Sequence, residues 1–361
     1  MPAIEQEMQI GHGQAGRLFL MISFGYLIVP FVSGWMTSRI NHRGALAVSA
    51  WIVGLSLIPF AFIQELWLLQ IFMVTLGLGA GLHLPSAMAT IAAEVQKSDW
   101  GKALSIHQCI PPLSFICAPL IAALLIMWVP WRSVIMIWAA IALLSAMVYS
   151  IKGRGGDFAG RRLNLEHVKS VVSLPGFWSM LLLLAMGIGG NAGIYAMLPL
   201  FFVNERGMDL AYANTLIGLS LISGVFAVFI AGWVIDKIGQ KATMIYILLT
   251  AAVCTIFLGI AERPWIPVLL FLQSAALSAF MPAAFGALAR VAPPSLRSVS
   301  TALGPPTSFV VGAGIVPAFI GLLGDVYTFS TGIISVGCFM LIGPALVGFL
   351  KLGQFDDQPG C

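Results

Sequence analysis

The sequence predicts an all-helical integral membrane protein, and three observations carry that prediction. Hydrophobic residues make up 59% of the 361 residues, charged residues only 9%, and the mean hydropathy is +0.98. An ordinary globular domain holds roughly 25% charged residues. The apolar residues form long runs rich in Leu, Ala and Gly, without the alternation of a barrel strand. Because backbone groups in hydrocarbon must bond within their own segment, we expect these runs to be helices.

The apolar runs are separated by charged residues or by Pro and Gly, and each is long enough to cross a hydrocarbon layer of about 30 Å. They predict eleven spans, at residues 16–37, 45–64, 67–93, 102–127, 133–151, 176–203, 210–235, 242–261, 265–289, 297–323 and 329–350.

Lysine and arginine fall mainly on one side of these spans. Of the 18 such residues, 14 lie in one alternate set of loops and in the C-terminal tail, and four lie in the opposite set: Arg17, Arg132, Arg206 and Arg263. Positive charge marks cytoplasmic loops. We therefore expect a multi-pass protein of the inner or plasma membrane with a cytoplasmic C-terminus.

The longest polar gap, from Lys152 to Ser173, divides the chain into two groups of spans. The expected organisation is an N-terminal half of five spans (1–151), a cytoplasmic middle loop (152–175), a C-terminal half of six spans (176–351) and a cytoplasmic tail (352–361). Residues 163–173 within the middle loop are expected to form a short surface helix.

The two halves resemble each other at an offset just under 200 residues. The stretch 34–43 (GWMTSRINHR) corresponds to 232–241 (GWVIDKIGQK), 198 residues later. The Pro-Pro pair at 111–112 recurs 194 residues on, and Pro85 has a counterpart at Pro282. The chain is therefore expected to be an internal duplication.

The residues of the first repeated stretch predict a helix end followed by a tight turn. A glycine lets two helices approach, a small polar or acidic residue ends the helix, and the residue at Asn41 or Gly239 can take a left-handed turn. Basic residues then hold the turn in the cytoplasm. We expect both stretches to act as conformational latch loops, through Gly34, Arg39, Arg43, Gly232, Asp236, Lys237, Gly239 and Lys241.

The pattern Gly-x-x-x-Asp-Arg/Lys-x-Gly-x-Lys/Arg in these stretches resembles the signature of the major facilitator superfamily. The resemblance implies a two-half helical bundle that moves a solute by alternating access. It also implies that the acid pairs with basic groups on a neighbouring helix and stabilises one of two states. The second copy matches well, whereas the first has Ser38 for the acid and Asn41 for the glycine.

The resemblance also implies six spans in each half, and the N-terminal half shows five. Residues 4–16 look like the external loop that follows a first helix in that family, so we expect helix one to be absent from this sequence. The rival interpretation is an eleven-span protein with its N-terminus outside.

Ionisable side chains at membrane depth are few. No acidic residue falls in the middle of a span, and the deep ionisable groups are His83 and His107. Histidine titrates near neutral pH, so either residue is a candidate proton acceptor or solute contact, with H⁺ as the coupling ion. The structural alternative is a neutral histidine bonded to a neighbouring helix.

Four further polar side chains are candidate solute contacts. Asn191 and Tyr195 lie four residues apart in a glycine-rich stretch and so share a helix face, and the glycines would let the helix bend there. In the resembling family the first helix of each half lines the cavity, which would include this pair. Gln108 and Gln273 are the other two candidates. For all four, hydrogen bonding between helices is the structural alternative.

Several functions and cofactors are not expected. The five cysteines lie far apart without ligand spacing, so neither a metal site nor a cofactor is expected. The basic residues build no nucleic-acid-binding stripe. An intramembrane enzyme would need a nucleophile and base, and no HExxH or GxSxG occurs.

The leading prediction is a monomeric secondary transporter for a small neutral, weakly acidic or hydrophobic solute, because no deep Arg or Lys is available to neutralise an anion. The alternatives are drug or metabolite efflux by proton antiport and a non-transporting membrane receptor or remnant. Antiport is weakened because Met73 replaces an arginine of the family pattern and the fourth-span element at Ala118 matches only loosely.

Overall fold

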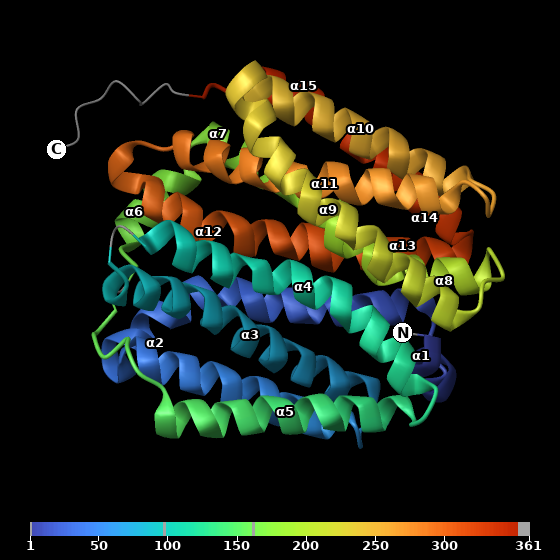
Figure 1. The fold of residues 1–361 in the computed structure, drawn as a ribbon, viewed down its shortest axis with the longest axis horizontal. Coiled ribbons are helices and arrows are strands. Elements are labelled where there is room, and N and C mark those ends of the chain that lie inside the picture. Colours follow the sequence, from blue (N-terminus) through green and yellow to red (C-terminus); the bar gives the residue numbers. More distant parts are fainter. Residues whose placement is uncertain (1, 97–98, 161–162, 353–361) are drawn as a thin grey trace.

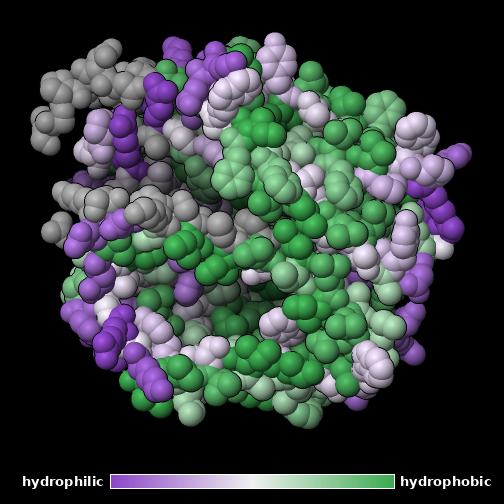
Figure 2. All heavy atoms as spheres, in the orientation of Figure 1, coloured by the Kyte–Doolittle hydropathy of each residue, from purple (hydrophilic) through white to green (hydrophobic). Residues whose placement is uncertain are grey.

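The computed structural model describes residues 2–96, 99–160 and 163–352, and within those ranges the regular structure is entirely helical. Most helices run roughly along the longest axis of the molecule (Figure 1). Hydrophilic residues gather at the two ends of that axis, and hydrophobic residues cover the band between them (Figure 2). This distribution fits a bundle that crosses a membrane along its long axis.

The helices follow the predicted order. The N-terminal half contains α1 (Pro2–Met8), α2 (His12–Phe60), α3 (Leu66–Glu94), α4 (Trp100–Ile126) and α5 (Trp131–Lys152). The predicted surface helix of the middle loop is confirmed as α6 (Leu165–Val172). The C-terminal half contains α7 (Pro175–Ile188), η2 (Gly189–Gly193), α8 (Ile194–Asn204), α9 (Leu210–Ile238), α10 (Gln240–Ile260), α11 (Ile266–Arg290), η3 (Pro294–Leu296), α12 (Arg297–Phe309), η4 (Val310–Ile315), α13 (Val316–Val326), α14 (Phe329–Met340) and α15 (Gly343–Phe349).

Helix α2 contains two spans rather than one. Its 49 residues would be about 74 Å long if straight, more than twice the hydrocarbon thickness. Asn41 has non-helical backbone angles with φ at 58°, and there the chain reverses. Gly25 before the turn and Ile52 after it both lie against α3, at Gly77 and Gly79 respectively.

In the described part of the chain, nine helical segments are long and apolar enough to cross a membrane, and α2 is one of them. Counting its two arms separately and adding α4 accounts for the eleven predicted spans. The expected left-handed turn is confirmed at both repeated positions, since φ is 58° at Asn41 and 83° at Gly239.

Loops predicted to share a side do lie together. At one end of the bundle, called here the basic end, the turn at residues 41–43 contacts the middle loop and Glu94 contacts Gly156. At the opposite end, called the α1 end, Arg132 bonds Ala61 and Arg206 bonds Gly259. The alternation of sides read from the charges therefore holds in three dimensions.

The N-terminal segment differs from the expected external loop. Residues 2–8 form α1, and α2 begins at His12, four residues before the predicted span. The cause is packing, because Ile4 and Met8 of α1 contact the cluster that includes Phe60 and Trp131. Sequence patterns missed this helix because it is short and carries two glutamates.

The two halves are packed to different degrees. One large cluster of buried apolar side chains spans residues 171–350, whereas the cluster of the N-terminal half contains five buried residues. Between α4, α5 and the second arm of α2 lies an apolar groove of about 650 Å³. Leu113, Cys117 and Trp138 line this groove.

Candidate functional site

A cavity of about 350 Å³ lies on the seam between the two halves. It is lined from α2 and α4 of the N-terminal half and from η2, α8, α9, α12 and η4 of the C-terminal half. The lining residues are Phe19, Ile22, Phe115, Ala118, Pro119, Asn191, Ala192, Tyr195, Ala196, Pro199, Asn214, Ile217, Leu221, Phe309 and Ala313. No Lys, Arg, His, Asp or Glu is among them.

Asn191 and Tyr195 both line the cavity, on the shared face that their spacing predicts. The expected departure from regular helix is present, since η2 (Gly189–Gly193) is a π-helical turn between α7 and α8. Gly193 packs so closely on the backbone of Gly312 in the second π-helical turn, η4, that no side chain would fit. Single π-turns inside α-helices occur frequently at functional sites.

The two side chains present different groups to the cavity. The Tyr195 hydroxyl lies 3.5 Å from Ser220 Oγ and donates to the Leu270 carbonyl at 3.4 Å. Because the hydroxyl is engaged there, Tyr195 contributes its ring to the cavity lining. The Asn191 side chain makes no hydrogen bond to any residue that the structure describes.

Asn214 of α9 is a cavity residue that sequence reasoning missed. Its side chain is only 8% exposed and has no hydrogen-bond partner in the described ranges. It shares a helix face with Ile217 and Leu221, which also line the cavity. A polar residue inside an apolar run was the available signal, but its position near the start of the span made it resemble an interfacial residue.

The seam is closed between the cavity and the α1 end. Gly16 of α2 packs directly on the backbone of Ala318 in α13, on the α1 side of the cavity. On the side toward the basic end, Tyr26 stacks on Phe309 with ring centroids 5.1 Å apart. At the rim of the α1 end, Asp325 of α13 accepts hydrogen bonds from the backbone N–H groups of His12 and Gly13, each at 2.8 Å. A carboxylate of the C-terminal half thus caps the start of α2 in the N-terminal half.

The structure brings His83 and His107 together but outside this cavity. Their rings, on α3 and α4, are parallel within 7° and their centroids are 5.9 Å apart. The His107 Nδ1 atom is buried with no hydrogen-bond partner in the described chain, while the His83 side chain is exposed. The pair is held by stacking, without a carboxylate.

Of the two glutamine candidates, Gln273 does not line the cavity. Gln273 is fully buried and donates to Thr255 Oγ1 at 2.7 Å, so it joins α11 to α10. The Gln108 side chain lies outside the part of the chain that the structure describes.

The first latch stretch is held by the middle loop. Arg43 Nη1 lies 3.7 Å from the carboxylate of Asp157, and the Arg43 N–H donates to the Gly156 carbonyl at 3.0 Å. Ser38, which replaces the acid of the family pattern, donates only to its own helix at Trp35. An acid of the middle loop therefore faces the basic residue of this turn.

The second latch stretch is more open. Asp236 is exposed and makes no hydrogen bond or ion pair with any described residue, and Gly232 and Gly239 have open space around them. Lys241 donates to the Gly348 carbonyl at 3.4 Å. The same kind of contact occurs in each stretch, where a basic side chain lies over a tryptophan ring. Arg39 lies over the Trp35 ring, and Lys237 lies over the Trp233 ring.

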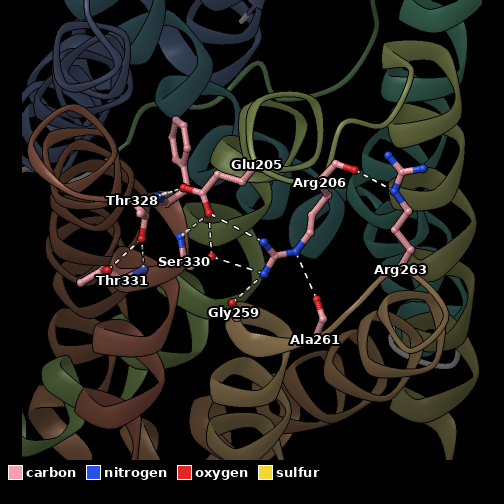
Figure 3. A network of polar contacts seen from close by, with 9 residues as sticks. Glu205, Arg206, Gly259, Ala261, Arg263, Thr328, Ser330 and Thr331 are labelled. Atoms are coloured by element: carbon pink, nitrogen blue, oxygen red, sulfur yellow. Dashed lines mark hydrogen bonds and ion pairs between the residues drawn. The ribbon is translucent and has the colours of Figure 1, made fainter.

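A polar network fastens the α1 end of the C-terminal half (Figure 3). Glu205, directly after α8, accepts from the backbone N–H groups of Phe329 and Ser330 and from the Ser330 hydroxyl at 2.6 Å. Arg206 donates to the carbonyls of Gly259 at 2.8 Å and Ala261 at 3.1 Å, which end α10. We call this network the C-terminal clasp.

An equivalent network fastens the N-terminal half. Glu7 accepts from Trp131 Nε1 at 2.5 Å and from Arg132 Nε at 2.7 Å. Arg132 also donates to the carbonyls of Ala61 at 2.8 Å and Ile63 at 3.2 Å. We call this network the N-terminal clasp.

The two clasps match residue by residue. Glu7, Ala61, Ile63, Trp131 and Arg132 each lie 198 positions before Glu205, Gly259, Ala261, Phe329 and Ser330 respectively. Only the arginine comes from a different place, the start of α5 in one half and the end of α8 in the other. The offset of 198 was available in the sequence, but scattered single residues do not stand out as a repeat.

Comparison with known proteins agrees with this architecture. The family model described as Major Facilitator Superfamily matches residues 1–262 and again residues 180–359. The probable sulfoacetate transporter SauU of Cupriavidus necator is 20% identical over 66% of this chain, and the chain covers 60% of SauU. NiaP of Bacillus subtilis, a candidate niacin/nicotinamide transporter, is 22% identical over 93% of this chain and 85% of its own.

Among solved structures, the chain is similar to a bacterial homologue of the human lysosomal transporter Spinster, crystallised in an inward-facing, unoccupied conformation. The TM-score is 0.81 at 14% identity, covering 95% of this chain and 90% of that one. The repeated turn, the duplicated halves, the fold and the match of the family model along the chain agree, and the protein belongs to the major facilitator superfamily.

Proposed function

We propose that this protein moves a small neutral, weakly acidic or hydrophobic solute across the cell membrane by alternating access, with its basic end and C-terminus in the cytoplasm. The observation that supports this most directly is the cavity on the seam, lined from both halves and closed toward the α1 end. Rocking of two related halves about such a site is how repeat-built transporters expose it alternately.

The chemistry of the cavity restricts the class of solute that can bind there. No charged residue is among the described lining residues, so a bound ion would lose its hydration without gaining a partner of opposite charge. Of the solutes in the names of the relatives, nicotinamide is uncharged and suits this lining, whereas sulfoacetate is an anion and does not.

The stacked pair of His83 and His107 supports H⁺ as the coupling ion. The two imidazole rings face each other with centroids 5.9 Å apart, on the neighbouring helices α3 and α4. The His83 side chain is exposed, and the His107 Nδ1 atom has no hydrogen-bond partner in the described chain. Uptake with H⁺ and efflux against H⁺ both use such a pair.

The test is transport by the purified protein in liposomes. Labelled nicotinamide should accumulate, or leave preloaded vesicles, faster than in empty liposomes, and an imposed pH gradient should drive it. His107→Ala should remove the dependence on the gradient, whereas the matched variant His167→Ala, on the exposed helix α6, should retain it. Equal rates with and without protein would refute transport of this solute class.

A receptor or sensor without transport is the second candidate, favoured by the apolar groove beside α4. The groove leaves one side of α4 without a packed helix neighbour, which supports a half that is not built to rock as a rigid unit. Solute binding with no flux in either direction would select this alternative.

A further inference from the structure

The cavity contains two carboxamide side chains without a protein partner. Asn214 is more than nine-tenths buried, and Asn191 lies in the π-helical turn η2. Neither makes a hydrogen bond within the ranges that the structure describes, although both line the same cavity. Buried polar side chains are nearly always hydrogen-bonded, and at membrane depth a free one is a functional signal.

The other polar groups near the cavity are engaged elsewhere. The Tyr195 hydroxyl is directed to Ser220 and to the Leu270 carbonyl. The remaining lining is made of aliphatic side chains, prolines and the rings of Phe19, Phe115 and Phe309. Among the described lining residues, the polar chemistry of the cavity is therefore confined to the two asparagines.

We propose that Asn191 and Asn214 select a neutral solute that carries one primary-carboxamide-like group on an apolar or aromatic body. Each asparagine offers two N–H donors and a carbonyl acceptor, so the pair satisfies a group that both donates and accepts. The apolar body lies against the phenylalanine rings. The volume of about 350 Å³ is at the small end of ligand pockets, which run from roughly 300 to 1,000 Å³.

This inference rests on the proposed function only in taking the cavity as the solute site, and it adds a rule of selection. A carboxylate has nearly the shape of a carboxamide but carries a charge and no donor. No cationic residue is among the described lining residues, so a carboxylate gains only neutral N–H donors for its lost hydration. Loss of a hydrogen bond that leaves the partner unpaired lowers affinity by about tenfold or more.

The test is equilibrium binding of labelled benzamide to the full chain in detergent, with benzoate and ethylbenzene as competitors. These probes share a ring and differ in charge and in hydrogen-bonding capacity. Benzamide should bind at least tenfold more tightly than benzoate at neutral pH, and also more tightly than ethylbenzene. Asn191→Leu and Asn214→Leu should each lower benzamide affinity about tenfold and leave ethylbenzene affinity within twofold.

Gln273→Leu is the matched control, because it removes the same group from a neighbouring helix outside the cavity, and benzamide affinity should stay within twofold. The preference of the unsubstituted protein needs no variant to fold. Equal affinity for benzamide and benzoate, absence of benzamide binding, or unchanged affinity in both asparagine variants would overturn the selection rule. Selective binding without transport would instead refute only the proposed function.

Discussion

The two halves of this protein are held at the α1 end by equivalent clasps, but their interiors are packed to different degrees. In the C-terminal half, the span formed by α7, η2 and α8 lies at the centre, with 72% of its apolar window buried, and contacts α11, α12 and α14 with their continuations. By the repeat, the counterparts of those partners are α3, α4 and α5. In the N-terminal half, an apolar groove lies between α4, α5 and the second arm of α2. Only 17% of the apolar window of α5 is buried, against 39% for its counterpart in the repeat, Phe329–Phe349.

The clasps show what this difference means. Glu205 follows α8 directly, and its counterpart Glu7 stands in α1. Helix α1 therefore holds the position of the last turn of α8, fastened by equivalent bonds to equivalent loops. The duplication thus extends to the α1 end of both halves.

The largest expected effect comes from truncating equivalent side-chain types in the two cores. Leu277→Ala removes a fully buried side chain that packs on Gly190, and should cost about 2–4 kcal/mol of unfolding free energy. Leu113→Ala, in the groove at 54% exposure, should change it by less than about 0.5 kcal/mol. Reversible unfolding in mixed micelles measures both. Equal losses would mean that the groove is packed in the membrane.

Much of this contrast could not be predicted from sequence. Span number, sides, the repeat and the left-handed turns at Asn41 and Gly239 follow from hydropathy, charge and local backbone chemistry, which are readable residue by residue. Packing density is not readable in that way, because in lipid an apolar residue has no preference between a neighbouring helix and an acyl chain.

The candidate site was predictable in part for the same reason. Asn191 and Tyr195 lie on one helix and their common face follows from their spacing. Asn214 reaches the cavity only through the packing of α9 on α4, where Gly218 lies against Leu120. Gln273 has the same chemistry but is directed at Thr255, a partner that no local pattern reveals.

The second prediction concerns whether an added helix can pack into the apolar groove. We expect an apolar helix of about 20 residues, joined ahead of α1 and collinear with it, to fill the groove as α7 and α8 fill the other core. Maleimide labelling of Cys117, which is exposed in the groove, should slow at least tenfold, whereas that of the exposed Cys338 should not change. The same helix joined behind α15 is the control. Undiminished labelling of Cys117 would contradict the expectation.

A smaller effect compares the clasps. Glu205→Ala leaves the backbone N–H groups of Phe329 and Ser330 without their acceptor in a half-buried place, and should cost about 1–3 kcal/mol. Glu7→Ala should cost less, because the Glu7 side chain is about half exposed and its bonds are screened by water. Thermal unfolding of both variants measures the difference. A larger loss for Glu7→Ala would show that α1 carries more of the stability than its exposure suggests.

The smallest effect is a two-phase dependence of α1 docking on pH. Burial raises the pKa of the Glu5 carboxyl above its ordinary value, so protonating Glu5 favours the docked helix as the pH falls from neutral. The Arg132 hydrogen bond lowers the pKa of Glu7, so its contribution is present above the ordinary glutamate range and is lost as the pH falls through that lowered value.

Amide exchange protection of residues 2–8, corrected for the intrinsic rate, should therefore rise and then fall on acidification. Glu5→Gln should abolish the rise and Glu7→Gln the fall. Because Glu5 contacts His12 beside the Asp325 cap, while Glu7 bonds Arg132 of α5, the two phases report separately on the seam and on the N-terminal clasp. If Glu5→Gln retained the rise, α1 docking would not depend on the burial of that carboxyl.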